Sequence, residues 1–276
     1  MKYNKIKSYA KINLALNIVG KTSNLHKIES IIAFVDLHDI ILIKSIKSKK
    51  HIISFSGKFS KNITKKNTVF KLLEILDRKK LLNNKKFQIK INKQIPSKAG
   101  RGGGSMNAGS ILKYFIKKKM IKTSKKNVIE ISKLIGSDVI LGLNFTNSIL
   151  TSTNKIKLFR KYKVFYALIV KPNFGCSTKQ IYSNVKKFNK PKIKQPLKKM
   201  FDLNCLKKMD NSLEQIALLK YPKLRLIKSY LESLGEPVFV RMTGSGSALV
   251  AYFKSKERCI SAKKMFNKKY KNYWCI

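Results

Sequence analysis

A glycine-rich loop between residues 96 and 105 is the segment of this chain with the strongest chemical signature. It contains glycines at positions 100 and 102–104 and ends in Ser105. Residues 87–95 alternate apolar and polar side chains as a strand does, and the apolar residues of 108–116 have helical spacing. Glycines let backbone N–H groups approach a ligand closely, and a helix N-terminus favours an anion. The strand, loop and helix therefore predict a phosphate site, with a plain connector as the alternative.

Lys11 and Asn13 lie two residues apart on an expected strand, residues 8–19. Alternation along a strand places both side chains on one face, about 7 Å apart. If that face is buried, a lysine and an asparagine on it need polar partners. Because 61 residues of the chain are lysine or arginine, a solvated lysine is the competing interpretation.

Asp138 stands in a Gly-Ser-Asp-Val segment that follows the helical pattern of residues 128–135. One interpretation is that this aspartate caps the next helix. The other is chemical, because a carboxylate near an acceptor hydroxyl can take its proton while a lysine neutralises developing phosphate charge. The chain has only 13 acidic residues, so each is a stronger candidate for a role than usual. Spacing alone leaves both interpretations open.

The charge balance is strongly positive, with a formal net charge of +48. Nearly all of the excess is lysine spread along the whole chain, with only six arginines. Recognition of base edges relies on arginine, and phosphate binding alone would need a localised basic stripe. We therefore expect no specific nucleic-acid partner, although polyanions should bind at low salt.

Composition also limits the compartment and the kinds of site. No apolar run approaches the ~18–20 residues that cross a bilayer, and no signal-peptide core follows the basic N-terminus. The four cysteines are scattered without a Cys-x-x-Cys pair, which argues against a zinc cluster and a disulfide framework. We expect a cytoplasmic protein with reduced thiols and no membrane partner.

Strand-like and helix-like segments follow one another in mixed order, which predicts an α+β fold in two domains, residues 1–156 and 157–276. Further helices are expected at residues 69–76, 213–219 and 224–234, and further strands at 163–170, 238–242 and 248–252. The lysine-rich stretch 186–199 contains two prolines and is predicted to be a surface excursion. Residues 243–247, Thr-Gly-Ser-Gly-Ser, connect the last two strands in the manner of a hairpin turn.

Three motifs resemble those of the GHMP small-molecule kinases. Residues 99–108, Ala-Gly-Arg-Gly-Gly-Gly-Ser-Met-Asn-Ala, are similar to the glycine loop of the 4-diphosphocytidyl-2-C-methyl-D-erythritol kinases within that family. Residues 9–14, Tyr-Ala-Lys-Ile-Asn-Leu, resemble the family's first motif, and residues 241–247, Arg-Met-Thr-Gly-Ser-Gly-Ser, its third. By the order and spacing of these matches, the chain is identified as a member of the family.

The resemblance implies an α+β, two-domain GHMP kinase fold. Its N-terminal domain would be ribosomal-protein-S5-like and its C-terminal domain ferredoxin-like, with the active site in the cleft between them. ATP and Mg²⁺ are the implied cofactors, and Lys11 and Asp138 the implied catalytic residues. ATP phosphate is expected at Pro96, Ala99, Gly100, Arg101, Gly102, Gly103, Gly104 and Ser105, of which Ser105 is also expected to contact Mg²⁺. The substrate is expected at Asn13, His26, Thr178, Tyr182, Gly244 and Ser245.

The substrate implied by the resemblance is a small molecule with a cytidine diphosphate group. Residues 20–30 resemble the family motif Asp-Gly-Tyr-His-Glu-Leu, in which the histidine recognises cytosine and the tyrosine stacks on it. His26 keeps the histidine, Leu25 stands at the tyrosine, and Tyr182 would supply the remaining aromatic platform. The implied reaction is phosphorylation of the 2-hydroxyl of 4-diphosphocytidyl-2-C-methyl-D-erythritol by ATP, in the non-mevalonate pathway to isoprenoids.

Residues 136–140 resemble the family motif Gly-Ala-Asp-Val-Pro, whose aspartate is the catalytic carboxylate, but Ile140 stands in place of the proline. Asn107 likewise stands in place of an aspartate of the family pattern. One alternative is a GHMP kinase that acts on mevalonate or homoserine, which the glycine triplet together with His26 disfavours. The other is a non-enzymatic, basic RNA-binding protein. We expect a monomer or a weak homodimer.

Overall fold

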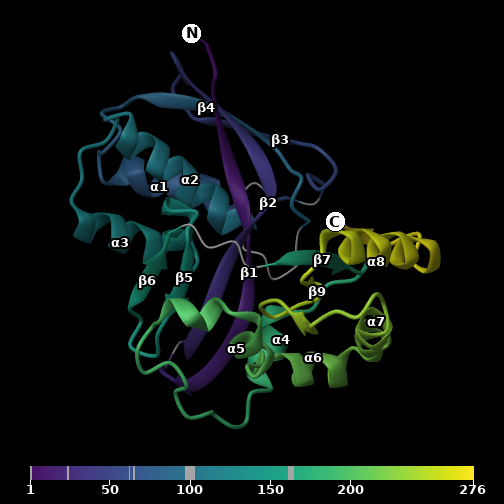
Figure 1. Cartoon of the computed structure of the whole chain (residues 1–276). Coiled ribbons are helices and arrows are strands. Elements are labelled where there is room, and N and C mark those ends of the chain that lie inside the picture. The colour runs from purple at the N-terminus through teal and green to yellow at the C-terminus, as the bar shows by residue number, and fades with distance from the viewer. Residues whose placement is uncertain (1, 24, 62, 65, 97–102, 161–164) are drawn as a thin grey trace. The chain divides into compact units, whose positions relative to one another are not determined.

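A computed structural model provides the structure of the chain and describes residues 2–23, 25–61, 63–64, 66–96, 103–160 and 165–276. Strands and helices alternate irregularly along it (Figure 1). The strands are β1 Asn4–Lys21, β2 His26–Ile46, β3 Ile52–Ser56, β4 Lys86–Asn92, β5 Asn147–Leu150, β6 Ile156–Phe159, β7 Tyr166–Lys171, β8 Phe239–Met242, β9 Leu249–Phe253 and β10 Trp274–Cys275. The helices are α1 Thr68–Arg78, α2 Gly103–Lys117, α3 Lys125–Ile135, α4 Thr178–Ser183, α5 Leu203–Lys207, α6 Glu214–Lys220, α7 Pro222–Glu232 and α8 Lys256–Lys269, with the 3-10 helices η1 Val139–Leu143 and η2 Lys198–Phe201.

The chain divides into two compact units, and the division falls within the two longest strands. Unit 1 comprises the described residues of 1–11, 34–97 and 102–145, and unit 2 those of 12–33 and 146–276. Strands β1 and β2 therefore each contribute residues to both units. The predicted domain boundary at residues 156 and 157 stays a prediction.

Unit 1 packs helices against a β-sheet. In this sheet β4 pairs with β3 in parallel and with the second half of β2 in antiparallel. The register aligns Ile41 with Ile91 and Ile43 with Ile89, so these residues share one face, and all four are fully buried. Helices α1, α2 and α3 place their apolar sides in the same core (Figure 1). Helices α1 and α3 each bury one stripe because their apolar residues recur at helical spacing. Helix α2 is buried on all sides over Met106–Leu112.

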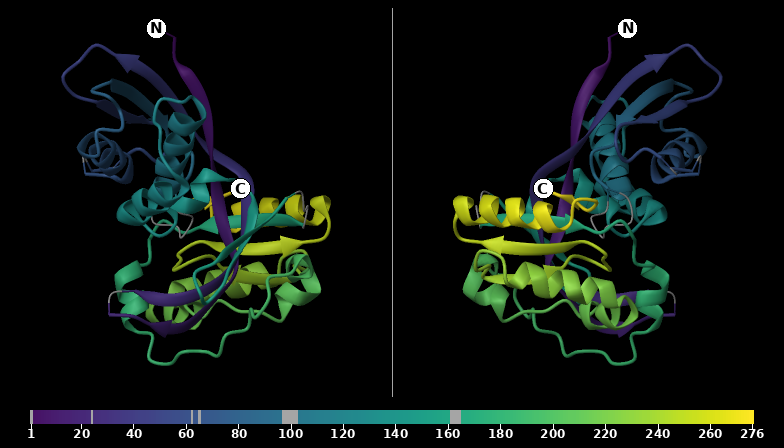
Figure 2. Two further views of the ribbon diagram at one scale, coloured as in Figure 1. Left: turned by 90° about the vertical axis from the view of Figure 1, so that its left-hand side faces the viewer. Right: turned by 90° about the vertical axis from the view of Figure 1, so that its right-hand side faces the viewer.

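Unit 2 contains a second sheet with the strand order β10-β7-β9-β8, all pairs antiparallel. The register brings Val170 and Met242 opposite Leu249, so one face of the sheet is apolar. Helices α6, α7 and α8 share their core with that face (Figure 2). In the same unit β5 pairs with the first half of β2 and with β6.

Most of the expected elements are present, with different ends. The strand expected at residues 8–19 extends over all of β1, and β4 ends at Asn92, three residues before the predicted strand does. The apolar segments 31–35 and 40–43, which are separated in the sequence by a stretch containing Asp36 and Asp39, belong to one continuous strand, β2. The mixed helix and strand content confirms the α+β class. Among the described residues, none of the helices is long and apolar enough to cross a membrane.

Candidate active site

Lys11 and Asp138 form an ion pair within unit 1. Lys11 Nζ lies 3.2 Å from Asp138 Oδ2. The lysine side chain is 6% exposed and the aspartate side chain 36%. The interpretation of Lys11 as a solvated lysine is therefore wrong, because its ammonium is almost removed from water and lies against a carboxylate that solvent can still reach.

Asp138 lies in the short turn between α3 and η1. The turn is closed by hydrogen bonds from the Val139 N–H to the Gly136 carbonyl and from the Leu141 N–H to the Asp138 carbonyl. Asp138 occupies the N-cap position of η1, but its side chain makes no capping hydrogen bond. The capping interpretation is thus wrong, and the carboxylate is directed to Lys11 instead. Ile140, in place of the expected proline, lies inside η1.

Two glycines let η1 approach α2 closely enough to hold this turn in place. A Cβ on Gly109 would lie 2.4 Å from the Val139 carbonyl oxygen, and one on Gly142 would lie 2.9 Å from the Met106 carbonyl oxygen. Real side chains do not fit at such distances, so backbone meets backbone at this crossing. Because Val139 follows Asp138 directly, this contact fixes the catalytic candidate relative to α2.

The C-terminal end of the glycine loop forms the first turn of α2. Gly103, Gly104 and Ser105 open the helix, and Pro96 is buried. The predicted phosphate residues Ala99, Gly100, Arg101 and Gly102 lie outside the described residues. Ser105 Oγ lies 3.7 Å from the position that a Cβ on Gly136 would occupy. The first turn of α2 therefore adjoins the turn that carries Asp138, and its free N–H groups suit an anion.

A buried aspartate that sequence reasoning missed supports the start of the glycine loop. Asp39 is 0% exposed and pairs with Lys93. It also accepts hydrogen bonds from the backbone N–H groups of Gln94 and Ile95, at 2.8 and 2.9 Å. Asn107 donates to it from α2 at 3.0 Å. The only signal in the sequence was a rare acidic residue within an apolar strand.

The amide at Asn107 has a clear consequence at this position. Its Nδ2 donates to Asp39 Oδ2, whereas an aspartate would bring a second carboxylate against the first. With asparagine at position 107, the buried cluster of Asp39, Lys93 and Asn107 contains one carboxylate and one ammonium. Its charges therefore balance. Of the described residues, no group of three or more His, Cys, Asp and Glu side chains could hold a metal ion.

Within unit 2, Asn13 is held by two hydroxyls. Its backbone N–H donates to Thr243 Oγ1 at 2.8 Å, and its Nδ2 donates to Ser30 Oγ at 2.7 Å. Ser30 in turn donates to the Ala15 carbonyl. Asn13 is 3% exposed, so its amide is oriented by these partners rather than by solvent.

The Thr243–Ser247 segment joins β8 to β9 and is held by hydrogen bonds from residues outside it. Asn211 Nδ2 donates to the carbonyls of Met242 and Gly244, both at 2.8 Å. Gly244 has a φ of 56°, which favours glycine. Ser245 Oγ lies 2.8 Å from Thr178 Oγ1 at the start of α4. The structure thus brings three of the predicted substrate residues, Thr178, Gly244 and Ser245, to one place.

The predicted cytosine residues also lie together in unit 2. The His26 and Tyr182 rings are 5.0 Å apart between centroids. Burial and the charge of Lys21 lower the pKa of His26, which favours the neutral imidazole. Leu25 is 68% exposed. A second aromatic ring, Phe188, lies 6.3 Å from His26, and sequence reasoning missed it because it stands among lysines.

Comparison with known proteins identifies the family. The model of the GHMP kinases N terminal domain matches residues 67–146, and that of the GHMP kinases C terminal domain matches residues 189–272. The 4-diphosphocytidyl-2-C-methyl-D-erythritol kinase of Pelagibacter ubique is 58% identical over 272 residues, which cover 99% of this chain and 97% of that protein. The chain belongs to the GHMP kinases, in the 4-diphosphocytidyl-2-C-methyl-D-erythritol kinase family.

Solved structures share the GHMP kinase fold at low sequence identity. A crystal structure of 4-(cytidine 5'-diphospho)-2C-methyl-D-erythritol kinase superposes with a TM-score of 0.78 at 21% identity, covering 99% of this chain and 98% of that one. The homoserine kinase from Cytophaga hutchinsonii superposes with a TM-score of 0.71 at 15% identity, covering 100% and 93%. Since kinases of different substrates share this fold, the substrate has to be argued from the residues of the site.

Proposed function

We propose that this GHMP kinase transfers the γ-phosphoryl group of ATP to the 2-hydroxyl of 4-diphosphocytidyl-2-C-methyl-D-erythritol. The products are the 2-phosphate and ADP, in the non-mevalonate pathway to isoprenoid precursors. The observation that carries the proposal is the ion pair of buried Lys11 with Asp138, in a chain 58% identical to a kinase of that name. A buried lysine paired in this way favours an enzyme over the basic RNA-binding alternative.

In the proposed reaction Asp138 is the general base. Its carboxylate takes the proton of the substrate 2-hydroxyl as the hydroxyl oxygen bonds to the γ-phosphorus. The bond from that phosphorus to the β–γ bridging oxygen breaks, and ADP leaves with the electron pair. The side chain of Asp138 is 36% exposed, so a hydroxyl can reach it. Lys11, whose side chain is 6% exposed, places a poorly solvated positive charge where negative charge develops.

The phosphates of ATP would bind at the first turn of α2. Gly103 and Gly104 offer backbone N–H groups there, and the dipole of a 15-residue helix favours an anion. A Cβ on Gly103 would lie 3.4 Å from Lys93 Nζ and 3.3 Å from Ile95 Cγ2, so a larger residue here would have to displace these side chains. The side chain of Ser105 adds a hydroxyl on the same turn.

The residues present fit a magnesium ion that is held mainly by nucleotide. Mg²⁺ in kinases keeps few protein ligands and binds through substrate phosphates, which agrees with the lack of an acidic cluster among the described side chains. Ser105 Oγ is the oxygen we propose to contact it. When bound, the ion neutralises charge on the β- and γ-phosphates.

The substrate would be recognised by residues of unit 2. Asn13 presents an amide oriented by Ser30, and the Thr178–Ser245 pair presents two hydroxyls. His26 and Tyr182 would contact the cytosine ring. A cytoplasmic location and a monomeric or weakly dimeric state stay predictions.

The test is the kinase activity of Asp138→Asn, which keeps the volume of the side chain and removes the base. We expect kcat to fall ~10²–10⁴-fold, the usual contribution of a general base, with the affinity for ATP retained. Asp36→Asn is the matched control, because the Asp36 side chain is 92% exposed, and it should keep full activity. Mevalonate and homoserine should not be phosphorylated. An Asp138→Asn enzyme within threefold of the parent would disprove the role of the base.

A further inference from the structure

Phe188 is an exposed aromatic residue in the lysine-rich stretch 186–199. Its surface is 47% exposed, and the neighbouring positions 186, 187 and 190 are all lysines. An isolated exposed phenylalanine is ordinary on a protein surface. Phe188 differs because the chain around it is anchored, and because its ring lies 6.3 Å from that of His26.

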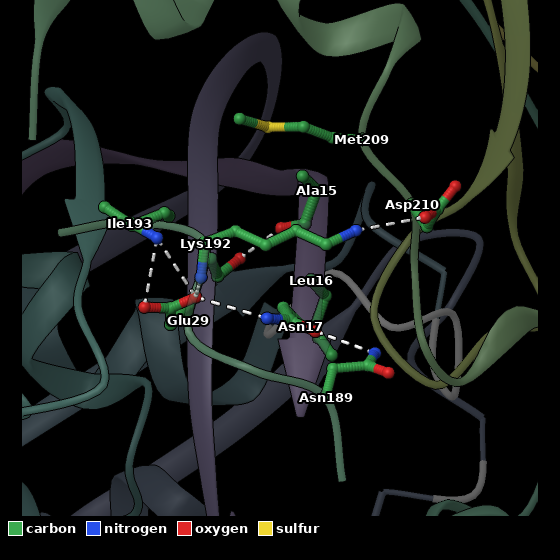
Figure 3. A pocket seen from close by; sticks show the side chains of 10 residues that line it. Ala15, Leu16, Asn17, Glu29, Asn189, Lys192, Ile193, Met209 and Asp210 are labelled. Atoms are coloured by element: carbon green, nitrogen blue, oxygen red, sulfur yellow. Dashed lines mark hydrogen bonds and ion pairs between the residues drawn. The ribbon is translucent and has the colours of Figure 1, made fainter. Parts of the chain in front are cut away.

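Asn189 fixes the backbone directly after this ring. Its backbone N–H donates to the Ile18 carbonyl at 2.9 Å. Its Nδ2 donates to Asn17 Oδ1 at 2.9 Å and to Ser212 Oγ at 3.1 Å. Figure 3 shows Asn189 reaching across to Asn17 on β1. Three hydrogen bonds to one residue leave Phe188 little freedom to move away from its place.

Glu29 anchors the same stretch a few residues later. This carboxylate is 0% exposed and accepts hydrogen bonds from the backbone N–H groups of Lys192, at 2.8 Å, and Ile193, at 3.3 Å. Asn17 Nδ2 donates to it as well, at 3.2 Å (Figure 3). Burying a carboxylate is costly unless its oxygens accept hydrogen bonds. The hydrogen bonds that satisfy Glu29 are the same ones that hold this stretch in place. The stretch 186–199, predicted to be a surface excursion, is therefore held in place by hydrogen bonds to β1 and β2.

The ring so held lies beside His26, the residue that follows the family position at which the sequence lacks an aromatic side chain. Leu25, at the family's tyrosine position, is 68% exposed and offers no π-face. His26, the next residue, contacts both Tyr182 and Phe188, with ring centroids 5.0 and 6.3 Å away. These distances are within the ~4.5–7 Å over which aromatic rings interact. Two aromatic rings thus lie within interaction distance of the histidine, one from α4 and one from the anchored stretch.

We infer that Phe188 stacks on the cytosine ring of the substrate and supplies the aromatic face that Leu25 does not. The pyrimidine would then be contacted by His26, Tyr182 and Phe188, and selectivity for a cytidine substrate would depend on a residue outside the family's motif. This inference rests on the proposed function.

The test is the steady-state kinetics of Phe188→Ala. We expect KM for 4-diphosphocytidyl-2-C-methyl-D-erythritol to rise about 5- to 150-fold, the equivalent of the ~1–3 kcal/mol of one base–aromatic stack. KM for ATP should stay within twofold. Phe188→Tyr should retain the parent KM, whereas Phe188→Leu should not, because leucine covers the base without a π-face. Phe70→Ala is the matched control, since Phe70 on α1 is 41% exposed.

A second variant tests whether the lost ring acts on the base itself. Adding Leu25→Tyr to Phe188→Ala should return KM toward the parent value, because a tyrosine there restores an aromatic face. Titration calorimetry with cytidine 5'-diphosphate should show the same order of affinities. It also reports binding where a variant is too slow to assay.

The outcomes separate this inference from the proposed function. If the parent protein does not phosphorylate the cytidine substrate, the proposed function is wrong. If the parent does so and Phe188→Ala or Phe188→Leu keeps its KM, the function stands and the role of Phe188 is wrong. An equal rise of KM in Phe70→Ala would likewise overturn the inference.

Discussion

Lys11 and Asp138 differ in their contact with water, and this asymmetry decides how each substitution should act. The lysine side chain is 6% exposed and the aspartate side chain 36%. Removal of the lysine leaves a carboxylate that water can still solvate. Removal of the carboxylate leaves a buried ammonium, which costs more. The two residues therefore make unequal contributions to stability although they would serve the same reaction.

Lys11→Met should lower kcat by at least tenfold while the protein stays folded. Methionine fills the apolar space of the lysine stem but supplies no charge to the transferring phosphoryl group. Lys7→Met on the same strand is the control, because Lys7 is exposed. Thermal unfolding measured beside kcat separates the roles. A lower melting temperature with unchanged kcat would mean that Lys11 serves only the fold.

His26 gives a prediction for pH at the same scale. Burial first, and the charge of Lys21 second, lower the pKa of its imidazole, so the ring is neutral at pH 7 and becomes charged only below its ordinary pKa of about 6.5. A charged ring has two donors and no acceptor. KM for the cytidine substrate should therefore be constant from pH 7 to 8 and should rise as pH falls through the lowered pKa.

The titration of His26 can be followed directly, because the chain has three histidines. Lys21→Ala removes a positive charge near the ring, so the midpoint measured by NMR should move to higher pH. The rise in KM should move with it. If the midpoint moves and the rise does not, the KM effect comes from another group.

At the scale of elements, the crossing of α2 and η1 positions the turn that carries Asp138. Gly109→Ala would place a Cβ 2.4 Å from the Val139 carbonyl oxygen, and backbone cannot yield there as a flexible side chain does. We expect a loss of about 1–3 kcal/mol in the free energy of unfolding, as for other overpacked sites. The kcat should also fall, since Asp138 precedes Val139. Gly20→Ala, whose added Cβ would meet only Lys27 side-chain atoms at 3.7 Å or beyond, is the control in a denaturant titration.

The Asp39 cluster joins β2, the end of β4 and α2. Asp39→Asn would leave the Lys93 ammonium, 4% exposed, without its carboxylate. Breaking a buried pair costs about 3–5 kcal/mol. Because Gln94 and Ile95 lead directly into the glycine loop, we also expect KM for ATP to rise. Chemical denaturation and ATP kinetics measure the two effects. Unchanged ATP kinetics in a destabilised variant would restrict Asp39 to a structural role.

For the whole molecule, the net charge of +48 should govern association without specificity. Lysine is spread over the chain rather than gathered into one segment. We expect binding to single-stranded RNA at ~50 mM salt that is largely lost by ~200 mM, because such binding is driven by counterion release. It should show no preference between sequences. Fluorescence anisotropy checks this, and a sequence-selective complex that survives high salt would revive the RNA-binding alternative.

Features that depend on neighbouring residues were predictable from the sequence. The alternation in β4 and the helical spacing in α2 follow from side-chain direction along each element, so both were expected within a few residues of their ends. Lys11, Asp138 and Asn13 were found because motifs of adjacent residues carry the family resemblance. Spacing alone did not choose between a solvated and a buried Lys11, or between a capping and a chemical Asp138.

Pairings between distant residues were decided only by the tertiary structure. Glu29 meets the backbone of Lys192, 163 residues away, and Asp39 meets Gln94, 55 residues away. Neither carboxylate belongs to a local pattern, so no periodicity marks its partner. The lysines around Phe188 predict an exposed segment and give no sign of its neighbour His26. Its position beside His26 depends on the hydrogen bonds that Asn189 makes with distant residues. The sequence by itself determined the elements and the family motifs, because these reside in short segments. Which buried charges hold the loops, and which aromatic rings gather around His26, depends on how the chain folds back on itself.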